Sequence, residues 1–221
     1  MSPEIIRLIA QSTLDTLAMV GVAAGLGTLF GLPLGVFLAT SKRGELFAAP
    51  AANLFLGTLV NATRSTPFII LVVAIIPFTR LIAGTSIGTA AAIVPLTVAS
   101  TPFIARLIEG AVREVDQGLV EAARAMGATP VQIVRKVLVP EALPAIVLGL
   151  TLALVSLIGF SAMVGAGGGG GLGDLGIRSG YQRCMPDVMA AVDAVLIVLV
   201  QLVQSIGDRL ARHLNKRLHH A

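Results

Sequence analysis

Long uncharged stretches are the dominant pattern along the chain. Residues 16–41, 81–105 and 142–173 contain no charged residue, and residues 46–79 contain only Arg64. A fifth, less uniform stretch runs from about 185 to 207, with Asp187 and Asp193 near its start. About 20 apolar helical residues cross the hydrocarbon core of a bilayer, and a charge buried there is costly. The pattern therefore predicts an all-α integral membrane protein, one transmembrane domain over residues 1–221, with five spans near residues 15–40, 53–79, 84–107, 142–164 and 187–207.

The composition narrows the class of protein. Hydrophobic residues make up 55% of the 221 residues, charged residues only 13%, and the mean hydropathy is +0.89. A soluble domain carries about 25% charged residues, so a soluble globular protein is excluded. The net charge of +4 does not indicate nucleic-acid binding, because aromatic residues amount to 4% and the basic residues lie scattered at the ends of apolar stretches.

Cysteine and histidine usage indicates neither a metal site nor a cofactor. The single cysteine, Cys184, excludes an internal disulfide and a cysteine-rich metal site. His213, His219 and His220 lie in the basic C-terminal tail without carboxylate companions, so we expect them to be solvated. The N-terminus does not read as a cleaved signal peptide, because Glu4 and Asp15 interrupt the region that should be basic and then apolar.

The distribution of positive residues predicts an orientation, since Lys and Arg near span ends are held on the cytoplasmic side. Eleven fall on one predicted face and four on the other. The richer face has Lys42, Arg43, Arg106, Arg113, Arg124, Arg135, Lys136, Arg209, Arg212, Lys216 and Arg217; the poorer face has Arg7, Arg80, Arg178 and Arg183. We therefore expect the N-terminus outside, the C-terminus in the cytoplasm, and Cys184 in an outer loop.

The segment between the third and fourth spans is the one sizeable polar interruption. Residues 106–141 hold ten of the chain's twenty-eight charges. Within this loop, taken as residues 108–141, Glu121 to Met126 are good helix formers, and Gly127 suits the left-handed position after a helix end. Thr129 is placed to cap a second helix that starts at Pro130, with Gln132 as its capping-box partner.

Two proline residues mark the end of the second helix in this elbow. Pro140 and Pro144 are expected to end it and to open the fourth span. The alanine-rich first helix could dock into a groove of a partner protein, with Glu121 and Arg124 as polar contacts at the rim. An amphipathic helix resting in the lipid headgroups, or a connector packed on its own bundle, are alternatives that the residues leave open.

The elbow resembles the cytoplasmic signature of permease subunits of bacterial ABC importers. That signature is Glu-Ala-Ala, three residues, Gly, nine residues, two aliphatic residues separated by one, then Pro. The chain matches it at Glu121, Ala122, Ala123, Gly127, Val137, Val139 and Pro140. In that family the loop couples to the ATP-hydrolysing subunit, so the resemblance implies a coupling role for Glu121, Ala122, Ala123, Arg124, Met126, Gly127, Ala128 and Pro130.

Longer runs resemble the methionine (D- and L-) importer permeases within this group. They cover residues 64–71, 76–80, 84–88, 92–98, 102–106 and 125–144. The resemblance implies a multi-pass protein of the bacterial inner membrane that translocates methionine, contacts two copies of a cytoplasmic ATPase, and receives substrate from an extracytoplasmic binding protein.

A glycine-rich segment follows the fourth predicted span. Seven glycines fall within residues 165–173, and each costs about 1 kcal/mol relative to alanine inside a helix, so we expect no stable helix there. A phosphate-binding loop is rejected, because the Lys-Ser/Thr that would complete it is missing. A flexible linker remains possible, as does a broken-helix gate at membrane depth, for which Gly165 and Gly167 are candidates.

Two further residues are candidates for a translocation pathway. Met163 lies where the fourth span gives way to glycine; it could form an adaptable constriction, touch a thioether substrate, or simply pack in the core. Arg64 lies within the second predicted span, where a charge is expensive. It could hold the carboxylate of an amino acid, cap backbone carbonyls beside Pro67, or lie at the interface. The string Ser-Thr-Pro-Phe-Ile occurs at residues 65–69 and again at 100–104, which suggests a small repeat or two proline kinks.

The sequence supplies no chemistry for ATP hydrolysis, so an active transporter would take its energy from a partner. Five spans enclose little room for a passage with two openings, which favours a symmetric homodimer in the membrane lipid. The sequence therefore predicts a permease subunit rather than an enzyme. The alternatives are a permease for phosphonates or quaternary amines, and a channel or scaffold without energy coupling.

Overall fold

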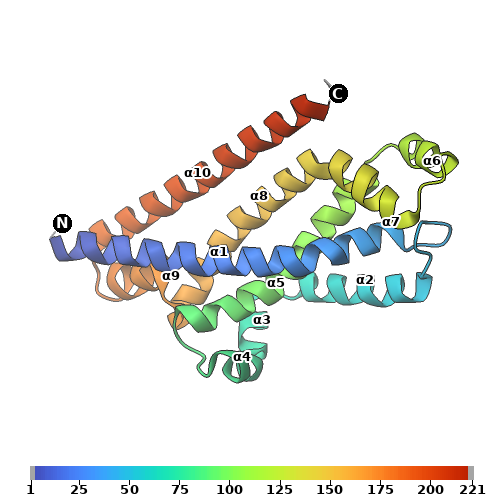
Figure 1. Ribbon diagram of the computed structural model, residues 1–221. Helices are drawn as coiled ribbons and strands as arrows, with labels where there is room; N and C mark the ends of the chain where they lie inside the picture. Colours follow the sequence, from blue (N-terminus) through green and yellow to red (C-terminus); the bar gives the residue numbers. More distant parts are fainter. Residues whose placement is uncertain (1–2, 219–221) are drawn as a thin grey trace.

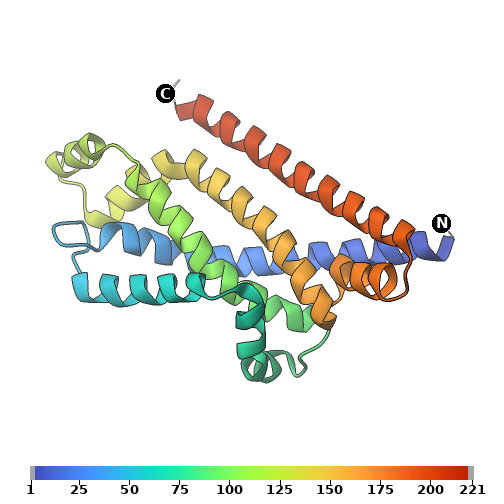
Figure 2. The same ribbon diagram turned by 180° about the vertical axis from the view of Figure 1, so that it is seen from behind.

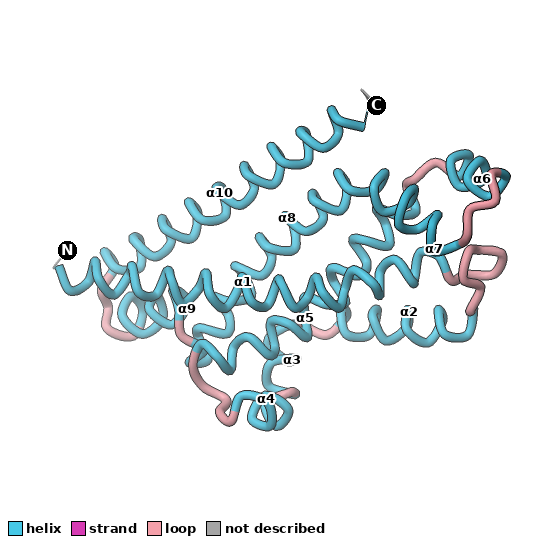
Figure 3. Tube along the Cα trace, in the orientation of Figure 1, coloured by secondary structure: helices cyan, strands magenta, loops and turns pink. Residues whose placement is uncertain are grey.

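The computed structural model describes residues 3–218, and helices joined by loops account for them, with no strand in that range (Figure 3). The long helices are α1 (Pro3–Thr40), α5 (Thr89–Arg113), α8 (Val139–Val164) and α10 (Pro186–Leu218). The shorter helices are α2 (Pro50–Ser65), α3 (Phe68–Ala74), α4 (Ile76–Ala83), α6 (Gln117–Ala125), α7 (Pro130–Ile133) and α9 (Gly171–Leu175). Three wide, π-helical turns complete the chain: η1 (Val134–Leu138), η2 (Gly165–Gly169) and η3 (Gly176–Tyr181).

The helices form an elongated bundle with two distinct ends (Figures 1 and 2). The N-terminus, α9 and the start of α10 lie at one end, which we call the α9 end. The elbow of α6 and α7 and the loop after α1 lie at the other, which we call the α6 end. α1 and α5 run side by side toward the α6 end, and α8 returns in the opposite direction.

A stripe of glycine allows α1 and α5 to approach closely. Gly27, Gly31 and Gly35 are spaced one turn apart on α1 and are buried. A Cβ atom on Gly35 would lie 2.5 Å from the carbonyl oxygen of Ala105 and 2.8 Å from the Cβ of Ile108. Spacing small residues four apart is a common way to bring two membrane helices into backbone contact. The sequence analysis did not identify this stripe.

The five-span architecture is confirmed with one correction. Four helices are long and apolar enough to cross a bilayer, and α2 with α3 makes a fifth candidate if the pair counts as one span. The prediction of a continuous helix over residues 53–79 is wrong, because α2 and α3 meet at an angle of 105° and α4 follows after Ile75. Pro67 explains the break: it lacks an N–H, and its ring disfavours a helical conformation at the preceding residue, Thr66, whose ψ is 124°.

The glycine-rich segment is folded and packed. The expectation that no helix persists there is wrong, because helical turns occupy residues 165–169 and α9 begins at Gly171. The chain direction changes at Gly168 and Gly170, which have φ of 88° and 78°. Gly88 donates a backbone hydrogen bond to Gly168 at 2.9 Å, and Leu172 donates one to the Thr16 hydroxyl at 2.9 Å. These ties to α1 and the start of α5 contradict a flexible linker and give a broken helix.

The path from the elbow into α8 is also more continuous than predicted. Pro140 and Pro144 do not end a helix, because α7, η1 and α8 follow one another without an intervening loop. η1 absorbs the proline: its hydrogen bond from Val139 N–H reaches back to the carbonyl of Val134, five residues earlier, and such wide turns accommodate proline within a helix. Likewise, α5 continues to Arg113, beyond the predicted loop start at residue 108.

The predicted solvation of the C-terminal tail can be examined for one histidine. His213 is exposed near the end of α10. His219 and His220 lie outside the described residues.

Candidate functional site

The first helix of the elbow is capped at both ends by its own sequence. The side chain of Asp116 accepts a hydrogen bond from the N–H of Gly118 at 2.8 Å, which satisfies one of the free donors at the start of α6. Gly127 follows the other end with φ of 80°, the left-handed conformation that glycine adopts without a steric penalty. The helix therefore holds a fixed shape although it has only nine residues.

The second helix starts with the predicted capping box. The hydroxyl of Thr129 accepts from the N–H of Gln132 at 3.4 Å, and the Gln132 side chain accepts from the N–H of Thr129 at 2.9 Å. Pro130 occupies the first turn, where its missing N–H has no consequence. These two caps fix the turn between α6 and α7.

The predicted coupling residues divide into an inward and an outward set. Ala123 is 4% exposed and packs, together with Val120, on the hydrophobic cluster that joins α5 to α8. Ala123 therefore anchors the helix and does not present surface to a partner. Ala128 is half-buried, whereas the outward set has no cover from the chain itself: Glu121, Ala122, Arg124, Met126, Gly127 and Pro130 are exposed.

Glu121 and Arg124 also border a polar cavity of about 260 Å³ at the α6 end. The cavity lies between α6, the end of α1 and the last turns of α5, and Glu45 and Arg113 line it as well. The charged residues of α6 thus lie between the partner-free face and the bundle.

An ion-pair network at the α6 end was not identified from the sequence. Glu109 lies between Arg106 and Arg113 on α5; it contacts Arg106 directly and Arg113 at 3.0 Å. Arg106 and Arg113 also donate to the backbone carbonyls of Gly57 and Leu38, at 2.9 Å and 3.0 Å. The spacing of three and four residues, which places these side chains on one helix face, was the available signal. Counting the arginines only for membrane orientation overlooked it.

The glycine-rich break and Met163 border a second, mainly apolar cavity of about 280 Å³. Met163 is 50% exposed, and Gly167 lines the same cavity together with residues of α3 and α5. Gly165 does not line it. Gly165 is buried where the chain folds back on itself: a Cβ atom there would lie 2.6 Å from the backbone nitrogen of Asp174. Met163 and Gly167 are thus brought together, and Gly165 packs behind them.

Arg64 lies at the end of α2, immediately before the break. Its guanidinium lies 5.9 Å from the ring centroid of Phe103, within the range of a cation–π contact. It borders a cavity of about 320 Å³ that shares Phe68 with the Met163 cavity. Within residues 3–218 Arg64 has no carboxylate or carbonyl partner, so the interpretation that it caps carbonyls beside Pro67 is wrong.

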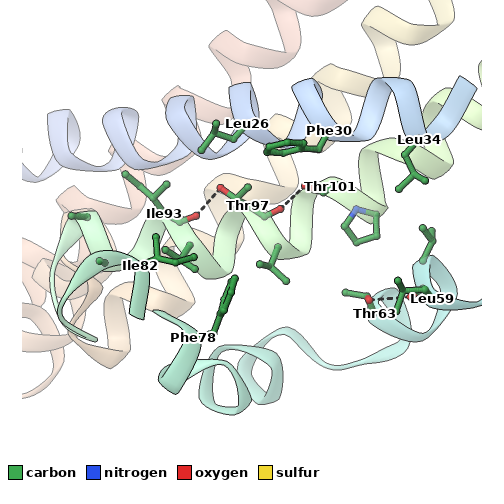
Figure 4. A pocket seen from close by; sticks show the side chains of 16 residues that line it. Leu26, Phe30, Leu34, Leu59, Thr63, Phe78, Ile82, Ile93, Thr97 and Thr101 are labelled. Carbon is green, nitrogen blue, oxygen red and sulfur yellow. Dashed lines mark hydrogen bonds between the residues drawn. The ribbon is translucent and has the colours of Figure 1, made fainter. Parts of the chain in front are cut away.

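The most spacious of these cavities, about 700 Å³, lies elsewhere, between α1, α2, α4 and α5 (Figure 4). Its lining includes Leu26, Phe30, Phe78 and Ile82. The hydroxyls of Thr97 and Thr101 border it, but they donate to carbonyls of their own helix at 2.8 Å and 2.9 Å. This cavity therefore presents an apolar surface, and none of the predicted pathway residues lines it.

Comparison with protein families follows from this architecture. The family described as "Binding-protein-dependent transport system inner membrane component" matches residues 31–220. The chain belongs to this family. Together with its apolar helices, membership makes it a multi-pass inner-membrane transport permease.

Relatives in the family are similar over most of the chain. A protein of Vibrio cholerae described as "Probable D-methionine transport system permease protein MetI" is 55% identical over 210 residues, which cover 95% of this chain and 93% of the relative. The Escherichia coli K12 protein described as "D-methionine transport system permease protein MetI" is 52% identical over 165 residues, covering 75% and 76% of the two chains.

Solved structures agree with the fold. A chain from a structure titled "Inward facing conformations of the MetNI methionine ABC transporter" superposes with a TM-score of 0.94 at 50% identity, covering 97% of this chain and 99% of the other. A chain from an amino acid ABC transporter structure superposes with a TM-score of 0.79 at 20% identity, which supports the fold alone.

Proposed function

We propose that this chain is the permease subunit of an ATP-driven ABC importer that translocates methionine across the cytoplasmic membrane. The observation that carries the proposal is the 50% identity, over 97% of the chain, to a methionine ABC transporter of the same fold. The names of the relatives include D-methionine, which supports D- as well as L-methionine as cargo. ATP hydrolysis is assigned to a partner subunit.

The elbow is the proposed point of energy coupling. α6 has caps at both ends and anchors at Val120 and Ala123, while Ala122, Met126 and Gly127 remain uncovered. A short helix with small outward side chains suits insertion into a groove of another protein. We therefore propose that α6 of each copy of a symmetric homodimer docks on one of two cytoplasmic ATPase subunits.

The orientation follows from the same assignment. The α6 end would be cytoplasmic, with the C-terminus, and the α9 end would face an extracytoplasmic substrate-binding protein. The excess of Lys and Arg in the predicted loops of the α6 end supports this orientation.

The proposed pathway runs along the cavities that share Phe68. Arg64 borders one cavity, Met163 and Gly167 border the other, and the broken helix beside them is held by Gly165. We propose that Arg64 attracts the carboxylate of the amino acid, while Met163 and the glycine break form the gate. Nucleotide-driven approach of the ATPases would then reorient the helices between two states of access.

Co-purification tests the docking proposal with a matched pair of substitutions. Gly127→Leu forces a branched side chain into a left-handed position on the elbow. Gly84→Leu does the same at the end of α4, far from the elbow; both glycines have positive φ, 80° and 72°, and open space around them. We expect both variants to insert, but only Gly127→Leu to lose the ATPase subunit. Equal retention of the ATPase by the two variants would contradict docking through α6.

Uptake competition tests the cargo. In proteoliposomes holding the whole transporter with its binding protein, unlabelled D- or L-methionine should compete with labelled methionine, whereas phosphonates and quaternary amines should not. Competition by a phosphonate or a quaternary amine alone would assign the importer to a different substrate.

A further inference from the structure

Glu109 is a buried carboxylate held between two cations. Its side chain is 10% exposed, compared with 24% for Arg106 and 33% for Arg113. One carboxylate oxygen contacts the Arg106 guanidinium and the other lies 3.0 Å from Arg113. A carboxylate that pairs with one arginine on each oxygen fixes the position of both side chains.

Each arginine continues from Glu109 to a different helix. Arg113 Nη2 donates to the carbonyl of Leu38, near the end of α1, at 3.0 Å. Arg106 Nη2 donates to the carbonyl of Gly57, within α2, at 2.9 Å. The carbonyl of Leu38 also accepts from Asn53 of α2 at 2.9 Å. One acidic residue on α5 therefore ties together three helices through charge-assisted hydrogen bonds.

The same part of α5 is rigidly joined to the elbow. α5 ends at Arg113, and α6 begins at Gln117 after a short turn capped by Asp116. Val112 and Val115 pack in one hydrophobic cluster with Val120 and Ala123 of α6. A displacement of α6 is therefore passed directly to the last turns of α5, where Glu109 lies.

We propose that Glu109 is a positioning residue for energy coupling: through Arg106 and Arg113 it makes the α6 ends of α1, α2 and α5 move as one body with the elbow. The proposal rests on the proposed function, because it concerns how motion of the docked elbow reaches the transmembrane helices. Without the carboxylate, two neighbouring guanidinium groups repel each other and release the carbonyls of Leu38 and Gly57. The elbow could then follow the ATPase without moving α1 and α2.

The test measures methionine transported per ATP hydrolysed by the complete transporter in proteoliposomes. Glu109→Gln preserves the size of the side chain and removes its charge. We expect the ATPase subunit to co-purify and to hydrolyse ATP, while methionine transported per ATP falls about tenfold, a typical coupling effect. Glu109→Asp keeps the charge and should recover part of the ratio.

Glu114→Gln is the matched control. Glu114 lies just beyond α5, is exposed, and has no ion pair within the described residues. Neutralising it removes the same charge from the same end of the molecule, so its transport per ATP should remain that of the unchanged protein.

An unchanged ratio in Glu109→Gln would overturn the proposal. A parallel loss of ATP hydrolysis and transport with a lower unfolding temperature would also overturn it, because that pattern indicates a purely structural role. If Glu109→Gln does not assemble, Arg113→Gln provides the second test, since it leaves the Arg106 pair intact and releases only Leu38. Failure of the unchanged protein to co-purify with an ATPase would instead reject the proposed function, and the two failures are thereby distinguished.

Discussion

The hydroxyl of Thr16 ties α1 to the glycine-rich break. Thr16 is 1% exposed; it donates to the carbonyl of Ser12 at 2.9 Å and accepts from the N–H of Leu172 at 2.9 Å. A buried backbone N–H left without an acceptor costs about 1–3 kcal/mol. The position of the break on α1 therefore depends on a single side-chain oxygen.

Replacing Thr16 with valine removes this oxygen and keeps the branched shape. We expect Thr16→Val to lower the free energy of unfolding by about 1–3 kcal/mol, measured by denaturant titration of the purified protein in detergent. Thr13→Val is the control, because Thr13 donates only to the carbonyl of Ile9 in its own helix, at 2.7 Å. A change within about 0.5 kcal/mol is expected for the control, and equal effects of the two variants would contradict the assigned role.

The neighbouring glycines should differ in the same way. Gly165→Ala would place a Cβ atom 2.6 Å from the backbone of Asp174, whereas nothing lies within 4 Å of a Cβ atom on Gly167. We expect Gly165→Ala to cost about 1–3 kcal/mol through overpacking and Gly167→Ala to leave the unfolding free energy nearly unchanged. Thermal unfolding followed by circular dichroism compares them, and a stable Gly165→Ala protein would argue against tight packing at the break.

At the scale of the helices, one repeated peptide shows what sequence alone can predict. Ser-Thr-Pro-Phe-Ile breaks the chain between α2 and α3 at residues 65–69, yet residues 100–104 lie inside continuous α5. Pro102 is buried in the packed bundle, whereas Pro67 is exposed. Tertiary contacts therefore decide whether the proline interrupts the helix. The caps of the elbow were predictable because Gly127, Thr129 and Gln132 act on their own backbone.

The close approach of α1 and α5 gives a prediction within one helix. Gly35→Ala would push a Cβ atom to 2.5 Å from the carbonyl oxygen of Ala105, whereas nothing lies within 4 Å at Gly25. We expect Gly35→Ala to destabilise the protein by about 1–3 kcal/mol. Gly25→Ala should instead stabilise it by about 0.5–1 kcal/mol, because alanine favours the helix. Denaturant unfolding separates these outcomes, and loss of stability in both variants would show that helix contact is not the cause.

At the scale of the whole molecule, hydrophobic stretches and charges predicted the class and the number of apolar segments, because both follow from transfer into a bilayer. Links between segments were missed. The Glu109 network and the glycine stripe each join parts of the chain that are tens of residues apart, as Arg113 to Leu38 and Gly35 to Ala105 illustrate. Their partners could not be paired without the packed structure.

The orientation of the whole molecule can be tested at Cys184. This free cysteine is exposed, at the α9 end of the bundle, between η3 and α10. We expect a membrane-impermeant maleimide to label it on intact spheroplasts, and Cys184→Ser to abolish the labelling. Labelling only after permeabilisation would place the α9 end in the cytoplasm and reverse the proposed orientation.

The wide turn η1 has a consequence for the length of the chain before α8. It holds one more residue per hydrogen-bonded loop than a regular helix, as the bond from Val139 to Val134 shows. Deleting a residue from Val134–Leu138 would allow a regular helix and would rotate everything after it by about 100°. Thr151, which packs against Gly207 of α10, would then point away from its neighbour. Insertions and deletions should therefore be rarer in this turn than changes of residue type.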